Sequence, residues 1–118
     1  MWYYSQSTGQ LHHDLDFIGV GYSGLKPDGY NNPEKESVPN VGPIPKGVYF
    51  IGGAWDHPRL GPCVMNLRMT KGDSFGRLGF FIHGNDKANN ASHGCIILDP
   101  TIRHMLRDTT DRILTVKE

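Results

Sequence analysis

Short apolar runs alternate with turns rich in Gly, Pro and Asn along the whole chain. A run of roughly four to eight apolar residues between turn residues is typical of a buried β-strand. Such runs predict strands at residues 2–4, 10–12, 17–22, 47–51, 63–69, 78–82, 96–98 and 112–116. Gly52-Gly53 is expected to end the strand over 47–51, and residues 56–59 to form a polar turn. Residues 23–46 show no period and predict a long surface loop, so the pattern predicts a mainly β domain.

A helix is expected only near the C-terminal end of the chain. Asp99 precedes Pro100 there, which is the order typical of an N-cap and the first helical position. The predicted helix covers about residues 100–107. Three apolar residues at helical spacing are expected to form its buried face: Ile102, Met105 and Leu106. The expected fold class is therefore mainly β, a small β-sandwich-like domain with one short C-terminal helix.

The length and charge of the chain narrow the classes of protein it can belong to. A chain of 118 residues fits a single domain over residues 1–118. Its 12 basic residues balance 12 acidic ones without a basic run, so we expect no nucleic-acid partner. No apolar stretch approaches the roughly 18 residues that span a bilayer, so we expect no membrane insertion. Residues 1–5 lack the basic start and apolar centre of a signal peptide.

The candidate chemistry lies where two apolar runs flank a polar loop. Phe80–Ile82 leads directly to His83, the loop ends in Ser92-His93-Gly94-Cys95, and Ile96–Leu98 follows. A thiol near its usual pKa is only a few per cent ionised at neutral pH. An imidazole beside it can take the proton and leave a strong nucleophile. The pattern therefore predicts a cysteine nucleophile, Cys95, with a histidine as its base.

The residues around the cysteine fit the same chemistry. Gly94 permits a tight turn and a close approach of the backbone to a substrate. The N–H groups of Gly94 and Cys95 can hold a developing oxyanion. Ser92 and His93 offer further polar contacts, although Ser92 is equally well explained as a turn residue. Tyr22 is explained as well by a place in the core as by a place in a substrate wall.

The identity of the base and a role for a metal stay open on the residues alone. His93 stands two positions before Cys95, so in an extended segment both side chains point the same way. His83 is therefore one of two candidate bases. These two histidines and Cys95 are also ligand types that zinc accepts, although only three ligands are visible and their spacing matches no zinc finger. The other cysteine, Cys63, lacks such surroundings and is expected to be structural, as Cys95 itself would be if its thiol were buried and inert.

The residues of this stretch resemble a known active-site signature. His83-Gly84, a polar loop and Ser-His-Gly-Cys before an apolar residue resemble the motif of YkuD-type L,D-transpeptidases. Four upstream blocks are similar to a compact branch of that superfamily, which includes L,D-transpeptidase effectors delivered by type VI secretion: residues 2–11, 21–24, 31–33 and 41–47. The resemblance runs over residues 2–116. It departs from the common motif at Ile96 and Ile97, which stand where that motif has Arg or Asn, and in the short loop before Cys95.

The resemblance implies a peptidoglycan-modifying cysteine enzyme that acts on tetrapeptide stems. It implies L,D-carboxypeptidase activity, L,D-transpeptidase activity, exchange of D-amino acids, or a combination of these. Cys95 would form a thioester acyl-enzyme, His83 would be the base and the carbonyl of Gly84 would orient it, with no cofactor and no metal. Four residues would contact the substrate or the oxyanion: Tyr22, Ser92, His93 and Gly94.

The resemblance also implies where the protein acts and with what. Its expected partners are peptidoglycan stem peptides, a secretion machinery and a periplasmic immunity protein. Because the chain shows no signal peptide, we expect a type VI system to carry it to the periplasm of a target cell. The alternative function is that of a non-catalytic wall-binding module with the same fold.

Overall fold

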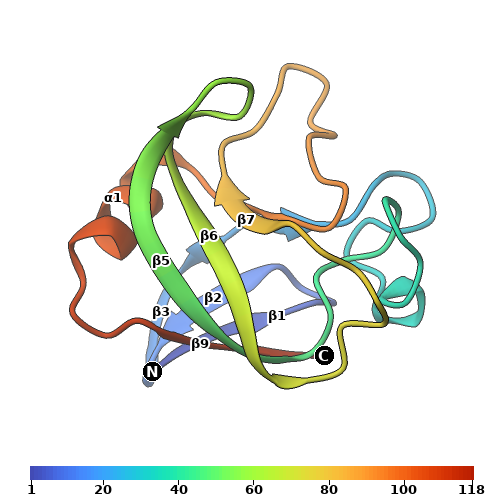
Figure 1. Ribbon diagram of the computed structural model, residues 1–118, viewed down its shortest axis with the longest axis horizontal. Coiled ribbons are helices and arrows are strands. Elements are labelled where there is room, and N and C mark those ends of the chain that lie inside the picture. Colours follow the sequence, from blue (N-terminus) through green and yellow to red (C-terminus); the bar gives the residue numbers. More distant parts are fainter.

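The computed structural model describes residues 1–118 and joins nine strands into one strongly curled sheet (Figure 1). The elements in chain order are β1 (Trp2–Ser5), β2 (Gln10–His13), β3 (Asp16–Val20), β4 (Tyr22–Ser23), the 3₁₀-helix η1 (Pro33–Lys35), β5 (Gly47–His57), β6 (Gly61–Gly72), β7 (Phe80–His83), β8 (Ile96–Ile97), α1 (Pro100–Asp108) and β9 (Ile113–Lys117). The strand order is β3-β2-β1-β9-β5-β6-β7-β8-β4. The mainly β class with one short helix is confirmed, and the layers of the expected sandwich are parts of a single, nearly closed sheet.

The edges of this sheet come together at Gly21. The sequence pattern predicts one strand over residues 17–22, but the chain forms two strands, β3 and β4, at opposite edges. A side chain at Gly21 would collide with the carbonyl oxygen of Ile97, so the position requires glycine. The single-strand prediction was wrong because a change of sheet edge at one glycine leaves no mark in the hydrophobic pattern.

The core lies inside the curl of the sheet. Seventeen buried apolar residues form one cluster that joins the strands, the long loop and the helix. Tyr4 and Tyr49 are fully buried in it, as is Ile44 from the end of the long loop. Burying one large apolar side chain contributes about 1.5–3 kcal/mol. This packing fixes the strands on which the candidate site is built.

Helix α1 starts where the sequence predicts it. The side chain of Asp99 accepts a hydrogen bond of 2.9 Å from the backbone N–H of Ile102, and Pro100 is the first helical residue. The helix packs against β6. Its buried residues are Ile102, Arg103 and Leu106, whereas Met105 is 44% exposed. The expectation that Met105 belongs to the buried face was wrong, because the buried face extends toward Arg103, and positions 103 and 105 lie on nearly opposite sides of a helix. This nine-residue helix is too short to cross a membrane.

The β5–β6 hairpin is longer than the sequence predicts. Strand β5 does not end at Gly52-Gly53 but continues to His57, and the turn is confined to residues 58–60. A shift of the β5–β6 register between Ile51 and Ala54 absorbs the two glycines, after which pairing resumes. In Figure 1 the tip of this hairpin rises beside the loop that follows β7. The extra length gives the candidate site one of its walls.

Candidate active site

Strands β7 and β8 bring His83 and Cys95 to neighbouring strand ends. The two strands are parallel, with Ile82 opposite Ile96. His83 is the last residue of β7, and Cys95 directly precedes β8. Continuing the register places Cys95 level with Phe81, two positions before His83. Residues that are 12 positions apart in the sequence thus meet at one edge of the site, as the apolar runs on either side predict.

The imidazole of His83 is buried and oriented by the backbone in its neutral form. It is buried, and its Nδ1 lies 2.8 Å from the carbonyl oxygen of Gly84. A carbonyl only accepts hydrogen bonds, so Nδ1 carries the proton and Nε2 keeps its lone pair. Burial lowers the pKa of His83, and the nearby charge of Arg103 acts in the same direction, while the bond to Gly84 opposes them. At neutral pH the ring can therefore accept a proton at Nε2.

The thiol of Cys95 is protonated in the resting site. Its Sγ lies 3.8 Å from the carbonyl oxygen of Gly79, and the residue is half-buried. Burial raises the pKa of Cys95 to about 11, although the backbone N–H of Phe81 and the charge of Arg77 both oppose this rise. No hydrogen bond joins the thiol to His83 in the structure. A base is therefore needed to form the thiolate.

Ser92 fastens the loop that carries the cysteine. Its side chain is fully buried, and Oγ donates to the carbonyl oxygen of Cys95 at 2.6 Å. Oγ of Ser92 also accepts hydrogen bonds from the backbone N–H groups of Gly24, at 2.9 Å, and Gly94, at 3.2 Å. These partners leave no group for a substrate. Of the two explanations that the sequence allows, the geometry therefore favours the turn role over a direct contact with substrate.

Tyr22 braces the loop that leads from His83 to Cys95. The hydroxyl donates to Oδ1 of Asn85 at 2.5 Å and accepts from the backbone N–H of Ala91 at 2.7 Å. The ring is buried and stacks on Tyr30, with 4.8 Å between ring centroids. Tyr22 thus ties together two points of the loop that are six residues apart in the sequence.

His93 lies at the mouth of the site. Its side chain is exposed and lines, together with His83, a hollow of about 260 Å³. The tip of the β5–β6 hairpin closes one side of this hollow with Arg59 and Leu60, and the loop over residues 84–94 closes the other. His93 is therefore exposed at the rim of this hollow, whereas His83 is buried.

A family model matches a part of the chain that includes β7, β8 and the loop between them. The family described as the Tlde1 domain matches residues 19–116. The chain belongs to the Tlde1 domain family. This is a family of L,D-transpeptidase-like type VI secretion effectors, so the resemblance to type VI effectors is confirmed at the level of the family. A search of curated proteins gives no match.

The structure of this Tlde1 domain adds a site residue, Arg77, that the sequence does not reveal. The guanidinium is buried, and it donates to the carbonyl oxygens of Glu36, Gly42, Pro43 and His93 at 2.6–3.4 Å. No carboxylate pairs with it. A side chain at Gly94, where φ is +124°, would collide with Nη2 of this arginine. Arg77 therefore fixes the long loop against the cysteine turn and places a positive charge beside the thiol.

Replacing Arg77 with methionine should raise the apparent pKa of the Cys95 thiol above that in the parent protein, because the charge of Arg77 opposes the rise caused by burial. The positive charge favours the thiolate, and methionine removes it. The Arg77→Lys variant keeps the charge and should stay closer to the parent. The measurement is the rate of thiol alkylation as a function of pH, with circular dichroism as the check of folding. An unchanged profile in a folded Arg77→Met protein would show that the arginine acts only as a structural anchor.

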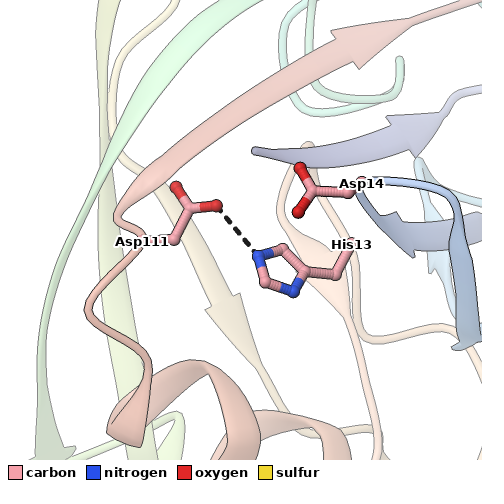
Figure 2. A group of neighbouring side chains, drawn as sticks. All are labelled: His13, Asp14 and Asp111. Carbon is pink, nitrogen blue, oxygen red and sulfur yellow. Dashed lines mark hydrogen bonds and ion pairs between the residues drawn. The ribbon is translucent and has the colours of Figure 1, made fainter.

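The ligand types that zinc accepts do not gather at the cysteine of the Tlde1 domain. The one group of such residues placed closely enough to hold a metal ion is His13, Asp14 and Asp111, whose ligand atoms lie within 4.8 Å of one another (Figure 2). His83, His93 and Cys95 do not form a group of this kind.

That group near the start of the chain is an ion-pair cluster. Nε2 of His13 lies 2.9 Å from Oδ2 of Asp111. The amino group of Met1 lies 2.7 Å from a carboxylate oxygen of Asp14 and 2.5 Å from one of Asp111. The amino group of Met1 and the imidazole of His13 thus already contact the carboxylates of this group.

Proposed function

We propose that the chain is a peptidoglycan-modifying cysteine enzyme that acts on tetrapeptide stems. The observation that carries the proposal is the pair formed by Cys95 and His83, a protonated thiol and a neutral, backbone-oriented imidazole at neighbouring strand ends. Membership of an L,D-transpeptidase-like effector family supports the choice of substrate. The site is thus of the YkuD type in its chemistry, with Cys95 as nucleophile and His83 as base.

The first half of the reaction transfers the stem to the enzyme. Nε2 of His83 takes the thiol proton as Sγ of Cys95 bonds to the carbonyl carbon between the L-centre of diaminopimelate and terminal D-alanine. The N–H of Gly94 already donates to Ser92 in the resting site, so the backbone N–H of Cys95 is the oxyanion donor in this proposal. The C–N bond then breaks, and His83 returns the proton to the leaving amine. A thioester acyl-enzyme and free D-alanine result.

The second half of the reaction depends on which acceptor reaches the thioester. His83 removes a proton from the acceptor, the acceptor bonds to the carbonyl carbon, and the C–S bond breaks. The proton then returns to the thiolate of Cys95. Water gives an L,D-carboxypeptidase, a free D-amino acid gives an exchanged stem, and the amine of another stem gives a 3–3 crosslink. Water, a free D-amino acid and the amine of another stem could all enter the hollow beside His83, because its walls are the β5–β6 turn and the loop after β7, both at the surface.

The proposed site of action is the periplasm of a target cell, where peptidoglycan is accessible. Production of the chain in the cytoplasm should leave a bacterium unharmed, whereas the chain behind a Sec signal should cause rounding, swelling or division defects. The Cys95→Ala form should be harmless in both compartments. Damage that persists without Cys95 would favour the wall-binding module, and equal damage without the signal would contradict a periplasmic substrate.

The same proposal includes an immunity protein. The hollow lined by His93 and His83 is the surface that such a protein would cover, because filling it blocks access to the proposed base. Coproduction of a periplasmic inhibitor that binds this hollow should therefore remove the toxicity.

A further inference from the structure

A second cleft adjoins the hollow beside His83. It has a volume of about 680 Å³ and lies between the start of α1, the tip of the β5–β6 hairpin and the loop after β7. Both hollows are lined by Leu60, Gly84 and Asn85. The two spaces therefore meet at the residues next to the proposed base, and a ligand that fills one can extend into the other.

The floor of this cleft contains a buried guanidinium with unused donors. Arg103 is 6% exposed; its Nε donates to the carbonyl of Leu98 at 3.1 Å, and its Nη1 donates to the carbonyl of Pro62 at 2.7 Å. Its Nη2 donates to no group of the chain, and it is not sealed from the cleft. This nitrogen is the atom closest to Gly84, at 3.0 Å from where a Cβ would stand. A side chain at Gly84 would press against it.

No carboxylate of the chain neutralises Arg103. Asp99 also lines the cleft, but its side chain caps the helix by accepting from the backbone N–H of Ile102. A buried cation without an anionic partner is costly, and a carboxylate that reaches Nη2 would gain a charge-assisted hydrogen bond. The cleft is thus built to accept an anion.

Two further donors face no acceptor in the chain. The hydroxyl of Tyr30 and the side-chain amide nitrogen of Asn89 both belong to residues that line the cleft, and neither makes a hydrogen bond within the chain. Oδ1 of Asn89, by contrast, accepts from Asn85 at 2.7 Å, which fixes the orientation of that amide. Hydroxyl and amide donors complement the guanidinium in binding the oxygens of a carboxylate.

We propose that Arg103, with Tyr30 and Asn89, forms a subsite for a carboxylate of the stem peptide close to the scissile bond. The proposal rests on the proposed function, because that function supplies a substrate with free carboxylates on both sides of the bond. The position beside Gly84 places the subsite next to the base that protonates the leaving amine. The terminal D-alanine, whose carboxylate is attached to the same carbon as that amine, is the group that fits best.

The test measures binding to the Cys95→Ala protein, which cannot turn the peptide over. Calorimetry compares a synthetic tetrapeptide stem with two forms of it, one amidated at the terminal D-alanine and one at the free carboxylate of diaminopimelate. Amidation of the bound carboxylate should weaken binding about tenfold or more, since a charge-assisted bond is lost. The amidated peptide that loses affinity identifies which carboxylate is bound. Equal affinity for all three peptides would overturn the proposal.

Variants test whether the loss of affinity on amidation comes from the proposed subsite. In the Cys95→Ala background, the Arg103→Gln protein should bind the unmodified peptide and its two amidated forms with equal affinity. The Arg103→Lys protein should retain part of the preference for the unmodified peptide. Arg107→Gln is the matched control, because Arg107 is an exposed arginine of the same helix paired with Asp108. Discrimination that survives in a folded Arg103→Gln protein would overturn the proposal.

The arginine also supports backbone carbonyls, so a second variant guards against a failure to fold. Tyr30→Phe combined with Asn89→Ala removes the two other donors and should reduce the preference for the acid; an unchanged preference would overturn their part in the subsite. Peptide turnover by the parent protein separates the two proposals. If the parent protein turns the peptide over but binds the acid and the amidated peptides equally, the proposed enzyme stands and the proposed subsite is contradicted. If it distinguishes the acid from the amidated peptides but turns none over, the subsite stands and the proposed activity is contradicted.

Discussion

Replacing Cys95 with alanine should abolish the turnover of tetrapeptide stems, with a loss of at least about 10⁴-fold in kcat. The thiol is the nucleophile of the proposed reaction, and no neighbouring group can replace it, because the hydroxyl of Ser92 is buried and bonded within the chain. The variant should remain folded, since it loses one sulfur atom at a half-buried position. The measurement is release of D-alanine together with the thermal unfolding midpoint.

The other cysteine provides the matched control for this prediction. Cys63 is buried, with its Sγ 3.7 Å from the carbonyl oxygen of Arg103, and it lines neither the hollow beside His83 nor the adjoining cleft. Cys63→Ala should therefore keep most of the activity. A Cys95→Ala protein that releases D-alanine at the parent rate would eliminate the mechanism.

Replacing His83 with alanine should lower kcat by about 10²–10⁴-fold with little change in KM, because the imidazole acts in the chemical step. The parent enzyme should also keep its activity as the pH falls through 6.5, the ordinary pKa of histidine, since burial lowers the pKa of His83 and keeps the ring neutral there. Activity should then decline at lower pH, as the ring gains its proton. The measurement is kcat/KM as a function of pH.

The second histidine of the site tests the assignment of the base. His93 is exposed, lines the same hollow and makes no side-chain hydrogen bond, so its replacement by alanine should affect KM more than kcat. A larger loss of kcat in His93→Ala than in His83→Ala would show that the two roles are reversed.

Two buried arginines give the site an electrostatic pattern that follows from packing. The charge of Arg77 lowers the pKa of Cys95, which burial raises, and the charge of Arg103 adds to the burial that lowers the pKa of His83. One arginine thus makes the thiolate easier to form, and the other keeps the imidazole neutral. Arg77 also supplies a cation near the cysteine in a chain whose motif has Ile96 and Ile97 where the common L,D-transpeptidase motif has Arg or Asn.

The sequence predicts the elements of the fold well where one local signal determines them. The Asp99-Pro100 cap and the apolar runs that flank His83 and Cys95 correspond to α1, β7 and β8. The errors fall where distant segments decide the structure. The register shift that lets β5 pass Gly52-Gly53 depends on pairing with β6, and the change of sheet edge at Gly21 depends on contact with Ile97.

The same distinction holds for the site. A motif in one segment predicts Cys95 and His83 as the nucleophile and base of the proposed site, and the carbonyl of Gly84, next to His83, is the partner of its ring. The two arginines cannot be found in this way, because all but one of their acceptors are backbone carbonyls from segments far away in the sequence. Carbonyl acceptors place no demand on residue type, and they leave no signal in the sequence.

The most direct test of the proposed function is mass spectrometry of purified muropeptides after incubation with the protein. The account predicts that tetrapeptide stems lose D-alanine and appear as tripeptides, exchanged tetrapeptides or 3–3 crosslinked dimers, and that the Cys95→Ala protein yields none of these. Unchanged stems with the folded parent protein, or the same products with the Cys95→Ala protein, would contradict it.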